Sequence, residues 1–388
     1  RTSWNRRYAR NWGRLGMKFE TTTFRFEDLT LNYDKQRIPL SSGQREKRQG
    51  QYRYYGAQGV IDYVDDYIFD GKYLLIAEDG ENLKSKKQDI AQIVEGKFWV
   101  NNHAHVVQGN ALCLTDYLCY LLNHNDLSGY ITGSAQPKLS QANLNAIAFE
   151  VPSIETQQKI VSIISALDEK IAINRAINDN LQQQAMALYA EMFLNSSDND
   201  VTAGTLSDIA VITMGQSPNG SSYNEDGVGE VFYQGRAEFG FRFPKRRLFT
   251  TEPKRMAETG DVLLSVRAPV GDLNVAYERC CIGRGLGAIH SKTGHSSFVL
   301  YTMFALKSQL DVFNGEGTVF GSINRDALNA IPIDVPLVTK IDRFEAVAHP
   351  IDELIRTNYE ENCRLEAIRD SLLPKLMSGE IDVSAVQL

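Results

Sequence analysis

The sequence predicts an α+β fold in which two β-rich domains are separated by two long antiparallel coiled-coil helices, with a pseudo-twofold internal repeat. Residues 154–193 contain neither glycine nor proline. Apolar residues recur in this segment at alternating spacings of four and three, which is typical of a long coiled-coil helix. The same pattern occurs again near the end of the chain. Such a repeat indicates that the chain consists of two similar units.

Each predicted helix carries a narrow apolar stripe, which we call its seam. The first seam comprises Ile160, Ile164, Leu167, Ile171, Asn174, Asn178, Leu181, Ala185, Leu188 and Met192. The second seam, offset by 184 residues so that Asp168 aligns with Asp352, comprises Phe344, Ala348, Ile351, Ile355, Asn358, Asn362, Leu365, Arg369, Leu372 and Leu376. Arg369 departs from the pattern and weakens the prediction for the far end of the second helix. The repeat extends upstream, where residues 147–152 stand opposite 331–336.

The asparagines of the two seams favour a defined helix pair. We align the two helices antiparallel so that the residue numbers of each facing pair add up to 536. Asn174 then faces Asn362, and Asn178 faces Asn358. A buried asparagine pair costs stability but disfavours slipped registers. Parallel pairing would also match the asparagines. However, the second domain begins where the first helix ends and finishes where the second begins, and domains usually keep their termini close. We therefore predict antiparallel helices rather than parallel ones or helices packed in a single core.

The remaining segments follow from the positions of the helices. Residues 1–16 are rich in arginine and tryptophan and precede Met17, so we interpret them as an expression leader or an alternative start, with a DNA-contacting basic arm as the less favoured interpretation. The predicted domains are 17–151 (first β-rich domain), 152–195 (first helix), 196–335 (second β-rich domain, with a polar hinge at its start), 336–380 (second helix) and 381–388 (tail).

Short apolar runs bounded by turn residues predict the strands of both domains. In the first domain the runs are 52–55, 60–64, 73–77, 98–100 and 105–107, and in the second they are 231–234, 261–266, 273–277 and 287–289. Apolar spacings of three and four predict one additional helix in each domain, over 111–123 and 297–310.

Composition narrows the class of protein. The chain is 43% hydrophobic and 23% charged, without a run of eighteen apolar residues, as expected of a soluble globular protein. Its five cysteines lack zinc-type spacing, which favours free thiols in the cytoplasm. The net charge of −7 is concentrated in the two long helices. The net charge therefore argues against nucleic-acid binding by bulk attraction, and any contact with DNA must use local basic runs.

Two related but non-identical domains at a fixed separation suit a ligand that is long, stiff and different at its two ends. Duplex DNA is such a ligand. A seam of this length makes a helix of roughly 50 Å at 1.5 Å per residue, which exceeds the roughly 34 Å of one DNA turn. Lysine and arginine neutralise phosphates, while arginine, glutamine and asparagine can bind base edges. The candidate DNA contacts in the first domain are Arg45, Lys47, Arg48, Arg53, Tyr54, Lys84, Lys86, Lys87, Asn102 and His103, and those in the second are Gln216, Gln234, Arg236, Arg242, Lys245, Arg246, Arg247, Arg267 and Arg284.

Several strings in both domains resemble the specificity subunit of type I restriction-modification systems, the HsdS family. In the first domain they are Tyr54–Ala57, Ile61–Gly71, Leu75–Gly80, Phe98–His105 and Gln136–Ser140. In the second domain Gln216–Pro218, Tyr233–Gly235 and Gly283–Leu286 are similar to another subtype of the same recognition domain. The resemblance covers about residues 20–380. The basic leader is not part of the family pattern.

The resemblance implies a subunit that has no chemistry of its own. Each target-recognition domain would read one half of an asymmetric bipartite site in double-stranded DNA. The helices would set the spacer between the halves and dock two methyltransferase subunits, which use S-adenosylmethionine to methylate adenine N6. Restriction subunits that use ATP and Mg²⁺ would also be recruited, while this chain itself would bind no cofactor and no metal.

Enzyme and scaffold functions fit the sequence less well. The Asn/Asp-Pro-Pro-aromatic motif of a DNA adenine methyltransferase and the GxxxxGK[ST] phosphate loop are both missing. Residues 283–288 imitate a dinucleotide fingerprint but lack the helix that should follow it. Metal ligation by His103 and His105, or a nuclease site at the acidic turns, is less favoured than a structural role for these residues. A protein-only coiled-coil scaffold would leave the basic and aromatic loops unexplained.

Overall fold

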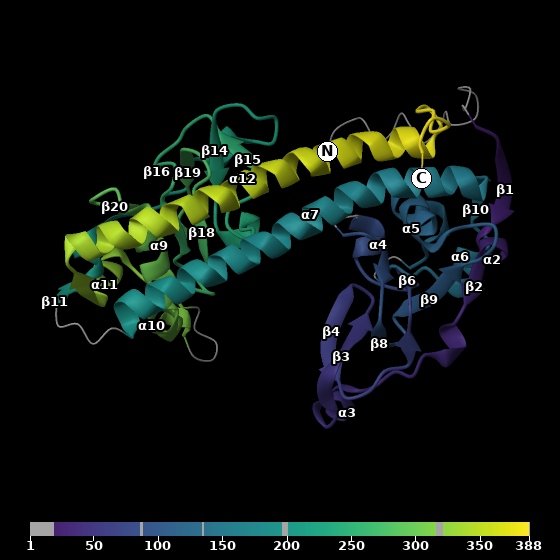
Figure 1. The fold of residues 1–388 in the computed structure, drawn as a ribbon, viewed down its shortest axis with the longest axis horizontal. Helices are drawn as coiled ribbons and strands as arrows, with labels where there is room; N and C mark the ends of the chain where they lie inside the picture. Colours follow the sequence, from purple (N-terminus) through teal and green to yellow (C-terminus); the bar gives the residue numbers. More distant parts are fainter. Residues whose placement is uncertain (1–18, 86–87, 134–135, 196–200, 316–320, 388) are drawn as a thin grey trace. The chain divides into compact units, whose positions relative to one another are not determined.

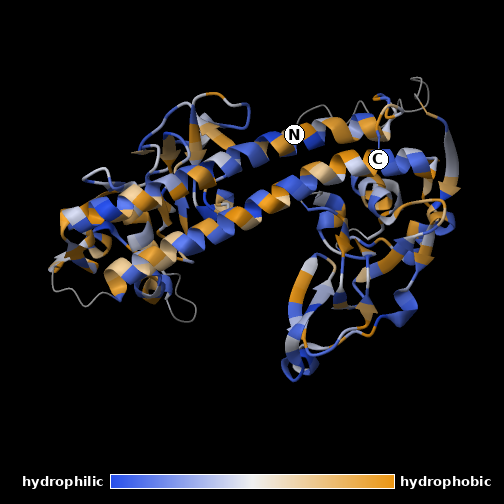
Figure 2. Ribbon diagram, viewed as in Figure 1, coloured by the Kyte–Doolittle hydropathy of each residue, from blue (hydrophilic) through white to orange (hydrophobic). Residues whose placement is uncertain are grey.

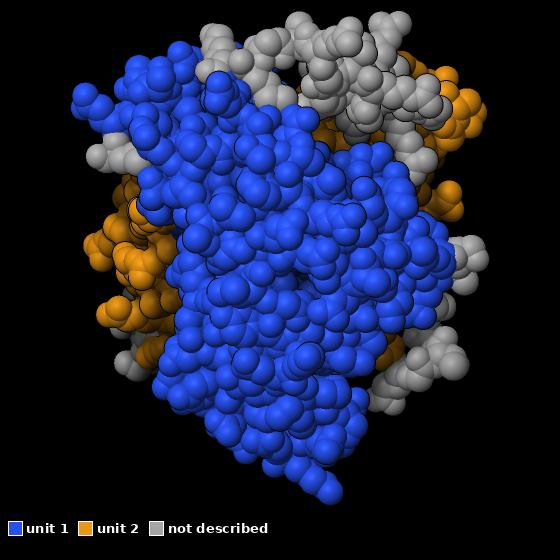
Figure 3. Space-filling model, turned by 90° about the vertical axis from the view of Figure 1, so that its right-hand side faces the viewer, with its two compact units in different colours: residues 1–172, 362–388 blue, residues 173–361 orange. Residues whose placement is uncertain are grey.

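The structure is a computed structural model that describes residues 19–85, 88–133, 136–195, 201–315 and 321–387. It divides into two compact units (Figure 3). Unit 1 comprises residues 1–172 and 362–388, and unit 2 comprises residues 173–361. The predicted leader 1–16, most of the hinge 195–200, and the candidates Lys86 and Lys87 lie outside the described residues. The limits predicted for the domains stay predictions, since both units include parts of both long helices.

The two predicted long helices are present. Helix α7 spans Ile154–Tyr189 and continues as a short π-helix over Ala190–Leu194. Helix α12 spans Val338–Met377 (Figure 1). Each passes without a break from one unit into the other. Hydrophobic and hydrophilic residues alternate along both helices, as the seam spacing requires (Figure 2).

The helices run antiparallel within each unit, so the parallel alternative is wrong. In unit 2, Asn358 Nδ2 donates to Asn178 Oδ1 over 2.8 Å, which is the pair expected from the sum of 536, and Asn174 Nδ2 donates to Glu361 Oε2 over 2.7 Å. Both asparagines of the pair are buried. The buried pair Asn178 and Asn358 is therefore satisfied within the seam, whereas Asn174 finds its partner in Glu361 beside the seam.

Arg369 does not end the second helix. In unit 1 its Nη1 donates to Asp168 Oδ1 of α7 over 2.9 Å, and Nη2 donates to Asp370 Oδ1 over 2.9 Å. The helix continues to Met377, and Leu376 joins Ile160 in the unit 1 core. The charge is tolerated in the seam because a carboxylate on the facing helix neutralises it.

Unit 1 contains two four-stranded sheets. The antiparallel sheet β2-β9-β6-β7 packs against helix α5, while sheet β4-β3-β8-β5 includes a parallel pair, β3 with β8. A separate antiparallel ladder joins β1 to β10. The strands are β1 (Thr21–Arg25), β2 (Thr30–Asn32), β3 (Gln49–Gly56), β4 (Gly59–Val64), β5 (Phe69–Asp70), β6 (Tyr73–Ala77), β7 (Ala91–Val94), β8 (Lys97–Val100), β9 (Ala104–Gly109) and β10 (Ala148–Pro152), and the helices are α2 (Phe26–Leu29), η1 (Asp34–Gln36), α3 (Ser42–Glu46), α4 (Asn82–Ser85), α5 (Thr115–His124), η2 (Ser128–Tyr130) and α6 (Gln141–Asn145).

Unit 2 repeats this plan. Sheet β12-β20-β17-β18 corresponds to β2-β9-β6-β7, the parallel pair β14 with β19 corresponds to β3 with β8, and the ladder of β11 with β21 corresponds to β1 with β10. The strands are β11 (Val201–Thr205), β12 (Ala210–Met214), β13 (Tyr223–Asn224), β14 (Glu230–Tyr233), β15 (Leu248–Thr250), β16 (Met256–Ala257), β17 (Val262–Ser265), β18 (Leu273–Val275), β19 (Cys280–Ile282), β20 (Leu286–Ser291) and β21 (Pro332–Pro336), and the helices are α8 (Leu206–Ile209), η4 (Gly220–Ser222), η5 (Arg236–Glu238), α9 (Ser296–Ala305), α10 (Lys307–Asp311), η6 (Val312–Asn314) and α11 (Arg325–Asn329).

The two additional helices differ from their predicted bounds. Helix α5 begins at Thr115 rather than at residue 111, because the Asn110 side chain accepts a hydrogen bond from the Leu112 amide and holds these residues in a turn. The helix predicted over 297–310 is broken at Leu306 into α9 and α10. None of the helices in the described part of the chain combines the length and hydrophobicity needed to span a membrane.

Candidate nucleic-acid interface

In unit 1 the segments that follow strands β3, β6 and β8 meet the segment 136–139, and we call this meeting point the unit 1 junction. Backbone hydrogen bonds hold it together. The amide of Asn101 donates to Tyr55 O over 3.0 Å, that of Glu78 donates to His103 O over 2.9 Å, and that of Leu139 donates to Glu78 O over 2.8 Å. The junction therefore has a fixed backbone although it consists of loops.

The unit 2 junction is formed by the equivalent segments, after strands β14, β17 and β19 and at 321–323. Its amides make the same three bonds: Gly283 to Tyr233 O over 2.8 Å, Val266 to Gly285 O over 3.0 Å, and Ile323 to Val266 O over 3.0 Å. The internal repeat is therefore retained down to individual hydrogen bonds. It also defines which residues are equivalent in the two units.

Glycines allow the loops of the unit 2 junction to approach one another closely. A Cβ atom on Gly215 would lie 2.1 Å from Gly283 O, and one on Gly283 would lie 2.8 Å from Gln234 Cα. Both distances are shorter than real side chains show, so only glycine fits. The close approach brings together four exposed candidates from four loops, namely Gln216, Gln234, Arg267 and Arg284.

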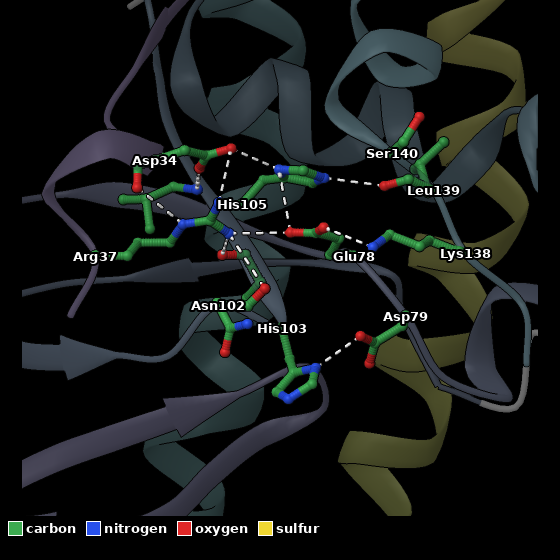
Figure 4. Close-up of polar contacts among 12 residues, drawn as sticks. Asp34, Arg37, Glu78, Asp79, Asn102, His103, His105, Lys138, Leu139 and Ser140 are labelled. Carbon is green, nitrogen blue, oxygen red and sulfur yellow. Dashed lines mark hydrogen bonds and ion pairs between the residues drawn. The ribbon is translucent and has the colours of Figure 1, made fainter. Parts of the chain in front are cut away.

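The unit 1 junction presents different side chains. Asn102 and His103 are exposed, and His103 Nδ1 lies 2.6 Å from Asp79 Oδ2 (Figure 4). Asp79 occupies the place that Arg267 has in unit 2, since each forms the isolated bridge to the last segment, with Lys138 and Ser322 respectively. The exposed edge is thus amide, imidazole and carboxylate in unit 1, but amide and guanidinium in unit 2.

Behind this edge, unit 1 contains a network of ionic side chains (Figure 4). Buried His105 lies 2.6 Å from Asp34 Oδ2 through Nδ1, and Arg37 contacts Asp34 at 3.4 Å and Glu78 at 3.1 Å. Lys138 reaches Glu78 at 3.3 Å from the solvent side. Burial opposes ionisation of Asp34, but the hydrogen bond and charge of His105, the Val106 amide and Arg37 outweigh it and hold its pKa below the usual value.

The basic candidates between β14 and β15 are exposed and ion-paired. Arg236 pairs with Asp272, Arg246 with Glu278, and Arg247 with Glu238 and Glu225. Lys245 is exposed beside them. The Arg236–Asp272 and Arg246–Glu278 pairs are at least partly exposed on both sides and contribute little to stability, so these two arginines can exchange a carboxylate for a phosphate at small cost. Glu238 is buried, so its pair with Arg247 is held more firmly.

The basic candidates of strand β3 and helix α3 are tied more closely to the protein. Arg45 donates to Asp62 over 2.8 Å, and this bond, with those from Gln49 and the Tyr63 amide, lowers the pKa of Asp62. Arg48 pairs with Asp65 at 2.8 Å, and Arg53 donates to Glu95 O over 2.8 Å. Lys47 is exposed, and Lys84 Nζ donates to Gly133 O over 2.7 Å.

Two candidates lie in the interior and are removed from the proposed contacts. Tyr54 is 0% exposed, and its hydroxyl accepts a hydrogen bond from the Leu40 amide over 2.8 Å. Arg242 is 3% exposed and donates to Asp352 of α12 over 2.7 Å and to Gln182 of α7 over 3.0 Å. Arg242 also contacts the ring of Tyr301 on α9. Both residues position other elements and cannot reach a ligand in this conformation.

Sequence reasoning missed the residues of the ionic network. Asp34 and Arg37 contact each other, but their other partners in the network lie 41 to 72 positions away in the chain, so no local pattern indicates the network. Lys138 is part of the string Gln136–Ser140, but only as a family feature. As for a metal, the described residues include no group of three or more His, Cys, Asp or Glu side chains arranged to hold one.

Comparisons with known proteins agree with this architecture. A family model described as "Type I restriction modification DNA specificity domain" matches residues 20–183. A Methanocaldococcus jannaschii protein assigned as the specificity subunit of type I restriction enzyme MjaX is 32% identical over 291 residues, which cover 69% of this chain and 68% of the relative. The type I restriction enzyme HindI specificity subunit of Haemophilus influenzae is 30% identical over 166 residues, which cover 41% of this chain and 33% of the relative.

A solved structure shows the same fold. The crystal structure of a type I restriction-modification S subunit from M. genitalium has a TM-score of 0.59 to this chain at 15% identity, covering 94% of this chain and 98% of that one. The predicted fold class and the resemblance read from the sequence are confirmed. This chain therefore belongs to the family of type I restriction-modification specificity subunits.

Proposed function

We propose that this chain is the DNA-reading subunit of a type I restriction-modification complex and that it has no catalytic activity of its own. Each unit reads one half of an asymmetric bipartite target through its junction. The observation that carries this proposal is the pair of junctions, which have the same backbone hydrogen bonds but different exposed side chains. A common frame with unlike contacts is what two different half-sites require.

The exposed side chains support different base preferences for the two halves. In unit 2, glutamine can bind adenine bidentately and arginine can bind guanine in the same way. Gln234 and Arg284 are exposed at the junction, and we assign such contacts to them. In unit 1, Asn102 offers an amide, and Asp79 offers a carboxylate that can accept from cytosine N4. Arg236, Lys245, Arg246 and Arg247 then contact phosphates, which fixes orientation but carries no sequence information.

The outer faces of the long helices support docking of partner subunits. Ile173 and Ile177 on α7 and Val347 and Leu354 on α12 are exposed apolar residues in unit 2. Apolar residues at helical spacing on a solvent face mark a surface that another helix can cover. Two methyltransferase subunits dock on the helices, and restriction subunits join the complex. S-adenosylmethionine, ATP and Mg²⁺ are bound by these partners and not by this chain.

Methylome sequencing tests the proposed reading function. A host that expresses this chain with its methyltransferase partner is expected to carry one bipartite methylated motif with two unlike halves and a fixed spacer. A host that expresses the methyltransferase alone is the control and should lack the motif. Equal methylation in both hosts would contradict a DNA-reading role and favour a protein scaffold.

A matched deletion tests whether the helices set the spacer. Removal of one heptad, about two turns, from α7 and from α12 at facing seam positions keeps the seam in register. The methylated motif should then keep both halves and have a shorter spacer. An unaltered spacer would show that the helices do not determine it.

A further inference from the structure

His105 has an environment that defines its protonation state. The side chain is 1% exposed. Its Nδ1 lies 2.6 Å from Asp34 Oδ2, and its Nε2 lies 2.9 Å from Leu139 O. A carboxylate oxygen and a carbonyl oxygen can only accept hydrogen bonds. Both ring nitrogens must therefore carry a proton for both bonds to form, and the ring is then an imidazolium.

The charged groups around His105 are consistent with a positive ring. Asp34 on η1 is an ionised partner, because its pKa is held below the usual value. Glu78, which follows β6, is 4.0 Å from His105 Nδ1 and is shared with Arg37 and Lys138. With the imidazolium these groups comprise three positive and two negative charges. A buried charge persists only where it is paired in this way.

The His105 bonds join strand β9 to η1 and to the last segment of the unit 1 junction. Strand β9 begins next to the loop that presents Asn102 and His103, and His105 is its second residue. The bond to Asp34 fixes η1 against β9, and the bond to Leu139 O fixes the last segment of the junction. The exposed edge of unit 1 is therefore supported by a proton that lies out of contact with solvent.

Unit 2 is built differently at the equivalent place. The position of His105, which pairs with Ile76 in its ladder, is taken by Gly287, which pairs with Leu264. A Cβ on Gly287 would meet Val266 Cγ1 at 3.3 Å and Met214 Sδ at 3.6 Å. The unit 2 junction is therefore filled by apolar atoms where unit 1 has an ion pair.

We infer that His105 is a positioning residue for unit 1, held as an imidazolium that keeps Asn102 and His103 in place for DNA reading. This inference rests on the function proposed above. Loss of either ring proton removes one of the two hydrogen bonds, and the unit 1 half of the target is then read less well. Reading by unit 2 does not change, since Gly287 stands in place of the ring.

Nitrogen NMR of the full chain tests the charge directly. The chain has six histidines, so histidine-selective ¹⁵N labelling gives a small set of signals, and the signal lost in His105→Gln identifies His105. At neutral pH both of its ring nitrogens should show the signature of a protonated nitrogen. A neutral His105 ring in the unmodified chain at pH 7 would overturn the inference.

Methylome sequencing with the variant tests the positioning role. Co-expressed with the methyltransferase partner, His105→Gln should lower methylation that depends on one half of the motif by about tenfold, the usual value of one charge-assisted hydrogen bond. His290→Gln is the matched control, because His290 Nδ1 also lies 2.6 Å from a carboxylate, that of Asp261, but its ring is exposed. The methylated motif of this control should retain both halves. Both halves retained in His105→Gln would overturn the positioning role. A doubly protonated ring in a chain that yields no methylated motif would support the charge assignment and contradict the proposed function instead.

Discussion

The two junctions share one backbone arrangement but have ionic side chains behind it in unit 1 and apolar atoms in unit 2. In unit 1, Asp34, His105 and Glu78 fill the space behind the exposed loops, and in unit 2 Met214, Gly287 and Val266 fill it. The three backbone hydrogen bonds in front are the same in both. The comparison shows that these three hydrogen bonds form whether ionic side chains or apolar atoms pack behind them. It also means that the two units should respond differently to mutation and to pH.

The largest difference is expected for removal of a buried charge. Asp34→Ala should lower the free energy of unfolding by about 3–5 kcal/mol, because it leaves the His105 charge without its partner. Urea unfolding followed by circular dichroism measures this value. Met214→Ala is the matched change in unit 2, where only half-buried apolar surface is removed. Equal losses of stability in the two variants would show that the ionic network is no more important than the apolar packing.

The next largest effect is expected from the close packing of loops within unit 2. Gly215→Ala places a Cβ 2.1 Å from Gly283 O and should cost about 1–3 kcal/mol through overpacking. Gly235→Ala in a neighbouring loop is the control, since nothing lies within 4 Å of its Cβ. Its stability should stay within about 0.5 kcal/mol of the unmodified chain. Thermal unfolding of the two variants compares them, and a stable Gly215→Ala chain would contradict the close approach.

Lowering the pH should change the stability contributions of Asp34 in unit 1 and Asp261 in unit 2 in opposite directions. Asp34 has a lowered pKa, so its contribution is complete above the usual value of 3.8 and is lost as pH falls through its folded pKa. Burial raises the pKa of Asp261 in unit 2, although the Glu258 amide and His290 act against it. Its ionisation therefore removes stability as pH rises from 3.8 through its folded pKa.

Urea midpoints between about pH 3 and 6 of Asp34→Asn and Asp261→Asn, each compared with the unmodified chain, measure these contributions. The advantage of the unmodified chain over Asp34→Asn should shrink as pH falls. The unmodified chain should be less stable than Asp261→Asn, and this deficit should also become smaller as pH falls. The stability of the unmodified chain relative to the variant therefore falls in the first comparison and rises in the second. A pH dependence of the same sign in both comparisons would contradict the different environments assigned to the two carboxylates.

The smallest effect on stability is expected for the exposed arginines of unit 2. Arg236→Ala with Arg246→Ala should change the free energy of unfolding by less than about 1 kcal/mol for each pair, because both partners of each pair are at least partly exposed. DNA binding should nevertheless weaken, and the slope of log affinity against log salt should fall by about one for each phosphate that is no longer neutralised. Fluorescence anisotropy at several salt concentrations measures this slope. An unchanged affinity and slope would remove both residues from the interface.

Sequence alone was sufficient for the periodic parts of the fold. A seam of about thirty residues defines a helix whatever surrounds it, and the paired asparagines predicted the contact between Asn178 and Asn358. The direction of the helices came from connectivity rather than from the seam. Arg369 weakened the prediction of the helix end because its neutralising partner, Asp168, lies on the other helix. Local spacing cannot reveal a partner of that kind.

The candidate site was predicted less well, for a similar reason. Tyr54 and Arg242 belong to aromatic and basic runs that look like exposed contacts, but tertiary packing places both in the interior. The network of Asp34 and His105 joins residues far apart in the chain, without a sequence motif. The exposed residues Gln234 and Arg284 were identified because they lie in the strings Tyr233–Gly235 and Gly283–Leu286, which resemble the recognition domain of the family. Such strings are local, whereas burial depends on the whole fold.

Arg242 constrains how this chain can change during evolution. Its guanidinium contacts Asp352, Gln182 and Tyr301 from three different helices, while its neighbours Phe241 and Lys245 are exposed. Substitutions at the exposed neighbours alter what the loop presents to a ligand and leave the interior untouched. A substitution at Arg242 removes the charged partner of the Asp352 carboxylate, which is left with the Tyr301 hydroxyl, and disturbs three helices together. New target preferences can therefore arise on either side of Arg242 in a lineage that keeps this one residue.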